Sequence, residues 1–304
     1  MKRNREDNAK PICYIAAFLT GAIISVMVVF NTALGTVTNN SISITINQIT
    51  GIVILSLIML LGKNSSVINP PRESAPLYKW FGGLFGLAVI SINYFSVKAT
   101  GAAIAMASAV LGQCLMGLVF DLTGFMGMKK RELKAKKALS LGVALIGIAI
   151  MLLSPNDRKD SHFYLFALLA IASGAITMIQ MVYNSGFAKK KGAFFSARQN
   201  VLSGLAGILA FILLFNFGPS KEALKGLYGY PIWKTAAGGT LAVAVVVITN
   251  LIIPKMPGAA SSILMSSGQI LTAVALDHYL YGINSPFLLV GAIIMILGLL
   301  IDRS

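Results

Sequence analysis

An internal repeat constrains this chain more than any other feature. The stretch 93–103, NYFSVKATGAA, returns at 250–260 as NLIIPKMPGAA. In both copies Asn is followed five residues later by Lys and then by Gly-Ala-Ala, and an apolar run ends at the Lys while another begins at the Gly. The chain therefore reads as two related units.

Other polar residues recur in the same order along the two units. The matched pairs are Asn31 with Asn184, Asn47 with Asn200, Gln113 with Gln269, and Asp121 with Asp277. One such match would be weak, but several in one order indicate a duplication.

The chain is 56% hydrophobic, above the roughly 45 to 50% of soluble domains, and its mean hydropathy is +0.79. A run of about 20 apolar residues can cross a bilayer as a helix. The sequence contains ten such runs, at 12–34, 43–62, 78–97, 101–120, 136–153, 162–187, 194–217, 233–253, 258–279 and 285–301. They predict an all-α integral membrane protein. The first run is too long for a cleaved signal, so we expect it to be retained.

The net charge of +15 does not require nucleic acid as a partner. If the N-terminus lies inside, alternating spans put 19 Lys and Arg residues in inner segments and 6 in outer segments, from the 25 in the chain. Cytoplasmic loops show this asymmetry. We expect a multi-pass membrane protein with both termini in the cytoplasm.

Five spans are assigned to each unit, with residues 1–153 as the first repeat, 154–161 as a linker and 162–304 as the second repeat. Because five is odd, the second repeat starts on the opposite side of the membrane. Inverted repeats of this kind commonly build transporters whose site lies between the repeats near the midplane. Since both repeats are fused, a monomer is sufficient.

The repeated amides are the candidate substrate contacts, because an amide in hydrocarbon needs a partner. Gln113 and Gln269 fall near the middle of their spans. Interhelical hydrogen bonding is the simpler interpretation for any one of them. The remaining candidates are Asn31, Asn93 and Tyr94 in the first repeat, and Asn184, Asn250 and Tyr183 in the second.

Asp121 and Asp277 lie eight residues after the glutamines, which predicts positions at the membrane surfaces and leaves proton coupling as a weaker alternative to capping or ion pairing. Arg198 lies in the first turns of its span. It could anchor the span or attract an anionic group, and we favour the anchor.

Other chemistry is not indicated. The two histidines and two cysteines lack zinc spacing, and no nucleophile and base pair lies in the spans. We expect no metal, no cofactor and no enzyme activity. No Asp, Glu or His occupies the middle third of a span, which favours a neutral or zwitterionic substrate.

These residues resemble the drug/metabolite transporter (DMT) superfamily, as a tandem fusion of two YdcZ-type (EamA-like) five-helix units. The resemblance rests on 21–35, 76–83, 101–103 and 111–125, and in the second copy on 174–184, 255–260 and 268–277. It implies ten helices in two inverted repeats, alternating access, and export or exchange of a small solute across the bacterial inner membrane.

The leading hypothesis is therefore a secondary transporter of a small neutral or zwitterionic metabolite. One alternative is a proton-coupled exporter of cationic drugs or amines that uses Asp277 or Asp121. An alternative of another class is a lipid-handling or sensory membrane protein without solute flux.

Overall fold

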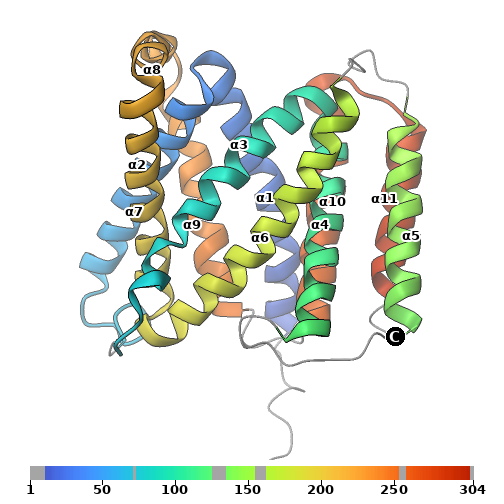
Figure 1. Ribbon diagram of the computed structural model, residues 1–304, viewed down its shortest axis with the longest axis horizontal. Helices are drawn as coiled ribbons and strands as arrows, with labels where there is room; N and C mark the ends of the chain where they lie inside the picture. The colour runs from blue at the N-terminus through green and yellow to red at the C-terminus, as the bar shows by residue number, and fades with distance from the viewer. Residues whose placement is uncertain (1–10, 71–72, 125–134, 155–161, 253–257, 302–304) are drawn as a thin grey trace, which may run out of the picture.

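The computed structural model describes residues 11–70, 73–124, 135–154, 162–252 and 258–301, apart from the side chains at 121, 137, 258–263 and 281. Helices dominate these ranges (Figure 1). The first half contains α1 (Pro11–Val37), α2 (Asn40–Leu61), α3 (Gly83–Thr100), α4 (Ala102–Thr123) and α5 (Ala135–Leu152), with the short 3₁₀ helix η1 (Leu77–Phe81) before α3. The second half contains α6 (Phe163–Lys191), α7 (Ala193–Phe211), α9 (Ile232–Ile252), α10 (Gly258–Tyr281) and α11 (Pro286–Ile301).

These helices occupy the ten predicted spans. Seven segments of the described chain are long and apolar enough to cross a membrane, and part of α5 (Ala138–Leu152) and the whole of α11 are shorter apolar helices. Leucines on outward faces are exposed, among them Leu57 and Leu60 on α2 and Leu289 and Leu297 on α11. A surface of this kind suits hydrocarbon and does not suit water.

One predicted loop is wrong. The apolar runs at 194–217 and 233–253 leave 218–231 between them as an expected loop. Instead, α7 continues through a π-helical turn (Ile212–Asn216) into α8 (Phe217–Ala223) and the 3₁₀ helix η4 (Leu224–Leu227), and only 228–231 lies outside a helix. The π turn adds a residue to the helix without ending it. The helix therefore persists past the Gly-Pro pair at 218–219. Of the predicted linker at 154–161, residues 155–161 lie outside the described residues.

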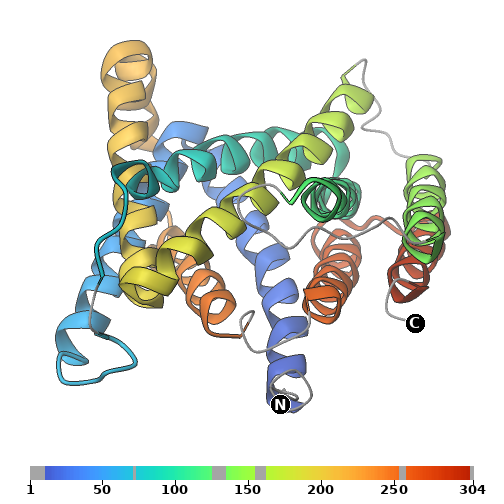
Figure 2. The same cartoon turned by 60° about the horizontal axis from the view of Figure 1, so that its bottom comes forward.

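The two halves are interlocked, because the most extensive helix contacts join one half to the other. α1 packs on α10, α4 on α6, α5 on α11, and α2 on α7. Figures 1 and 2 show α5 and α11 side by side at one end of the molecule. A buried apolar cluster fills the space between this pair and α4, with Val110, Met151 and Met295 among its members.

Glycines allow the two central crossings. A Cβ added at Gly21 would collide with the backbone of α10 at Met265, and one at Gly268 would collide with α1 at Phe18. The same arrangement recurs in the other crossing, where Gly112 of α4 lies against Ile171 and Gly174 of α6 lies against Ala109. Close backbone approach through small residues is how helices associate in lipid.

The second crossing can be tested at Gly112. In Gly112→Ala the new methyl group meets the Ile171 carbonyl, which cannot move aside. We expect the free energy of unfolding to fall by about 1–3 kcal/mol, as in overpacked cores. Thermal unfolding of detergent-purified protein measures the change. Gly142→Ala is the matched control, since a Cβ there meets nothing within 4 Å. Equal melting temperatures for the two variants would contradict the close crossing.

Candidate functional site

Four of the repeated amides, including the predicted contacts Asn31 and Asn184, form one hydrogen-bonded pair in each half. Asn47 Nδ2 donates to Asn31 Oδ1 over 2.9 Å, and Asn184 Nδ2 donates to Asn200 Oδ1 over 2.9 Å. Both pairs link the first and second helices of their half across 16 residues of sequence. Each pair thus satisfies amide groups that lipid could not hydrate.

Each pair also lies against a glycine pair from the other half. A Cβ at Gly238 of α9 would collide with the Asn31 amide oxygen, and one at Gly82, just before α3, would collide with that of Asn184. Gly239 and Gly83 similarly approach the backbones of α2 and α7. The asparagines therefore join three helices, two from one half and one from the other.

The two amide pairs are not equivalent. Gln180 Nε2 donates to Asn200 Oδ1 over 3.1 Å and to the carbonyl of Gly82 over 3.3 Å, which makes the second cluster a triad. Four residues before Asn31, the first half has Met27 instead. The Asn31 Nδ2 makes no hydrogen bond within the described part of the chain.

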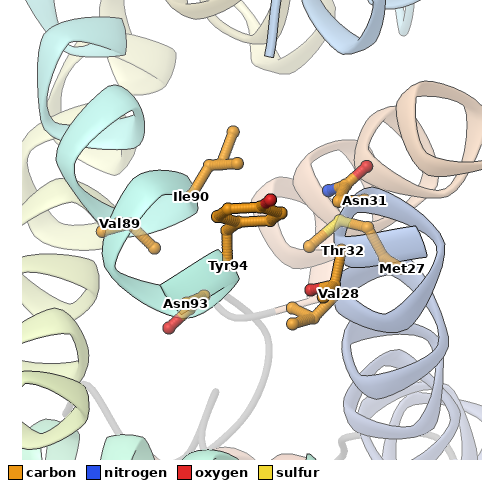
Figure 3. A pocket seen from close by; sticks show the side chains of 8 residues that line it. All are labelled: Met27, Val28, Asn31, Thr32, Val89, Ile90, Asn93 and Tyr94. Carbon is orange, nitrogen blue, oxygen red and sulfur yellow. The ribbon is translucent and has the colours of Figure 1, made fainter. Parts of the chain in front are cut away.

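A small cavity lies beside the first pair, between α1 and α3 (Figure 3). Its volume is ≈ 40 Å³, room for one or a few water molecules but well below the roughly 300 Å³ of a small-molecule pocket. Three predicted substrate contacts line it together. The lining residues are Met27, Val28, Asn31, Thr32, Val89, Ile90, Asn93 and Tyr94.

The polar groups around this cavity differ in how well they are satisfied. Tyr94 OH donates to the carbonyl of Gly35 over 2.9 Å. The Asn93 oxygen points away from α1 in Figure 3 and accepts from the hydroxyl of Ser173 on α6 over 2.8 Å. Thr32 is 4% exposed, and its hydroxyl has no hydrogen-bond partner in the described structure. A buried, unsatisfied hydroxyl beside a cavity is a group that a ligand or water could satisfy.

The other predicted contacts lie elsewhere. Gln269 is buried and donates to the sulfur of Met106 over 3.3 Å, whereas Gln113 is half-buried and makes no hydrogen bond to the described residues. Asn250 donates to the carbonyl of Ala193 over 3.2 Å. The Tyr183 hydroxyl donates to the carbonyl of Tyr78. The structure thus gathers Asn31, Asn93 and Tyr94 around one cavity and separates them from the glutamines.

Asp277 is buried inside the protein, where the sequence suggested a surface position. Its carboxylate accepts from the backbone N–H groups of Ala102 and Ala103 over 2.9 and 2.7 Å, and it is 1% exposed. It therefore caps α4 from α10, where the positive end of the helix dipole stabilises a carboxylate. The side chain of Asp121 lies outside the described residues.

Comparison with known proteins identifies the family. A family model described as "Putative inner membrane exporter, YdcZ" matches residues 12–151 and again residues 165–301. The chain belongs to the YdcZ family.

The two matches place this YdcZ protein as a two-unit fusion of the DMT type. A solved structure described as "Crystal structure of protein" is 17% identical, with a TM-score of 0.57, over 96% of this chain and 95% of that chain. This likeness supports the fold alone. No curated protein matches the chain. The chain is thus a multi-pass membrane protein of an inner membrane exporter family.

The coupling within the first amide pair can be measured in a double-mutant cycle. We expect Asn31→Ala and Asn47→Ala to interact by about 0.6 to 1.7 kcal/mol in thermal unfolding, the range of hydrogen bonds between membrane helices. The control cycle combines Asn31→Ala with Asn200→Ala, which removes one residue from each pair. Those two changes should add to within about 0.5 kcal/mol. A coupling energy of zero between Asn31 and Asn47 would show that their hydrogen bond does not stabilise the fold.

The cap on α4 is tested at Asp277. Asp277→Ala removes both acceptors, so we expect the free energy of unfolding to fall by about 1–2 kcal/mol. Asp277→Asn keeps one carbonyl oxygen and should lose less. Both are measured by thermal unfolding. An Asp277→Asn variant that melts like the parent protein but no longer transports would favour the proton-coupling role instead.

Proposed function

We propose that this protein is a secondary transporter that exports or exchanges a small neutral or zwitterionic metabolite by alternating access, with the cavity between α1 and α3 on the substrate path. The observation that carries the proposal is the unsatisfied Thr32 hydroxyl in a cavity bordered by Asn31 and Asn93. Membership of an exporter family supports transport as the process.

The lining chemistry favours an uncharged or zwitterionic group. Asn31 and Thr32 offer an amide and a hydroxyl without a net charge, and most of the remaining wall is apolar. No carboxylate or basic side chain is among the lining residues. A lone cation or anion entering this cavity would lose hydration without gaining a counter-charge.

The cavity is too small for a metabolite in this conformation, so transport requires α1 and α3 to move apart. Such a movement is compatible with the contacts present. The cavity itself separates the two helices beside Asn31, whereas the α1 and α10 backbones meet closely at Gly21. We propose that α3 moves relative to a more rigid α1 and α10 pair.

The alternative of proton-coupled export of cationic drugs depends on a carboxylate that can take up a proton. Two backbone N–H donors hold the Asp277 carboxylate at the start of α4, where it caps the helix. We therefore assign Asp277 a structural role, which leaves the neutral or zwitterionic substrate as the better supported function.

A ligand panel tests the substrate class. Thermal unfolding of the purified protein is followed with amino acids, amines, nucleosides, sugars and organic acids at several pH values. We expect a saturable stabilisation by one neutral or zwitterionic class, as binding to the folded state requires. Stabilisation by amines that grows with pH would favour the proton-coupled alternative. A response to lipid without any response to solutes would favour the lipid-handling alternative.

Thr32→Val separates a binding role from a structural one. Removing an unsatisfied buried hydroxyl should leave the melting temperature unchanged or raise it, while uptake into proteoliposomes falls about tenfold through the lost substrate hydrogen bond. Thr20→Val on the same helix is the matched control, because the buried Thr20 hydroxyl bonds its own helix at Ala16. Unchanged uptake in Thr32→Val would exclude the cavity from the path. Gln113→Leu with Gln269→Leu, in the same assay, tests the predicted glutamine contacts.

A further inference from the structure

Two basic side chains make cation–π contacts with a pair of aromatic rings. They lie where η1 meets the end of α6 and the start of α7, at the lower left of Figure 1. The rings of Trp80 and Phe195 meet edge to face with centroids 5.8 Å apart. Lys191 Nζ lies 5.6 Å from the Trp80 centroid, and Arg198 Cζ lies 5.6 Å from the Phe195 centroid. We call these four residues the basic aromatic site.

Arg198 has an unmet requirement in this site. Its Nε is buried and has no hydrogen-bond partner among the described residues. A buried donor on a charged group is costly when unsatisfied. Anchoring to the membrane surface explains the charge but not the buried, unpaired Nε.

No carboxylate compensates these charges within the described chain. Lys79, next to Trp80 in the chain, and Lys189 and Lys190, in the last turn of α6 with Lys191, add further positive charge. No described ion pair involves these lysines or Arg198. Glu73 is close by, since its backbone N–H donates to the carbonyl of Lys190, yet its side chain forms no ion pair with the described residues. The site thus has excess positive charge on half-buried side chains.

The repeat shows that packing does not require an arginine here. The counterpart of Arg198 in the first half is Thr45, which bonds its own helix at the carbonyl of Ser41 over 2.8 Å. The counterpart of Lys191 is Thr38, which likewise bonds its own helix at Leu34. The same helix junction therefore forms with neutral side chains, and the cations have a different purpose.

We propose that the basic aromatic site binds a negatively charged phosphate group, with Arg198 as its principal donor and Lys191 beside it. A guanidinium offers a planar set of donors to phosphate oxygens, and an anion would offset the positive charge and accept a hydrogen bond from the buried Nε. The phosphate belongs either to an anionic phospholipid, for which basic pockets between helix ends are suited, or to a free phosphate compound. The site shares none of its four residues with the lining of the cavity between α1 and α3 and does not depend on the proposed substrate.

Thermal unfolding of the detergent-purified full chain tests this site with three probes. Phosphatidylglycerol supplies an anionic lipid, phosphatidylethanolamine with the same acyl chains supplies a lipid without net charge, and sodium phosphate is compared with sodium chloride at equal ionic strength. We expect a saturable stabilisation by phosphatidylglycerol that exceeds the effect of phosphatidylethanolamine. In Arg198→Thr, which introduces the residue found in the other half, the half-saturating concentration should rise about tenfold.

Lys234→Gln is the matched control, because Lys234 Nζ lies 5.4 Å from the Trp233 centroid in the same kind of contact but outside the site. It should respond like the parent protein. Stabilisation by sodium phosphate that is lost in Arg198→Thr would assign the site to a free phosphate compound. If Arg198→Thr does not fold, Lys191→Gln should still weaken the response severalfold. An unchanged phosphatidylglycerol response in both variants, or an equal response to the two lipids, would overturn the proposal.

Discussion

Close backbone contact between helices of opposite halves is the constraint on which the rest of this structure depends. In lipid there is no hydrophobic driving force that brings helices together, because the lipid tails are as apolar as the side chains. Helix association must therefore be stabilised by close van der Waals packing. The chain meets this requirement at Gly21 with Gly268 and at Gly112 with Gly174. Because each crossing takes one helix from each half, a single half would lack a partner for every one of these surfaces.

The buried polar groups follow from the same constraint. Once α9 and α3 approach through their glycine pairs, they cover the asparagines of the opposite half, and those amides must bond within the protein. Asn31 with Asn47, and Asn184 with Asn200, do so. Ser43 and Ser196 extend the symmetry by donating to the carbonyls of Asn31 and Asn184 over 2.8 and 3.1 Å. Contacts that occur in both halves are thus explained by packing.

The sequence predicted the spans well because a long apolar run has few folded alternatives in a membrane. It also matched the right amides, and the equal spacing of 16 residues in both halves was a signal for their pairing. The sequence could not predict that Asp277 is buried. Counting residues along α10 gives the depth of Asp277 in the membrane, but it does not show that α4 begins beside it. The region 218–231 was missed because Gly and Pro usually end a helix, whereas here a π turn carries the helix past them.

Packing does not explain the buried polar atoms that have no hydrogen-bond partner in the described part of the chain. Thr32 keeps an unsatisfied hydroxyl beside a cavity, and Arg198 keeps an unsatisfied Nε where the other half has Thr45. If packing alone had shaped both halves, the arginine would not be needed, because Thr45 shows that the same helix junction forms without it. In a duplicated chain, each position of one repeat can be compared with the corresponding position of the other. The polar atoms that break its symmetry without a partner are the atoms for which a ligand is the simplest physical explanation.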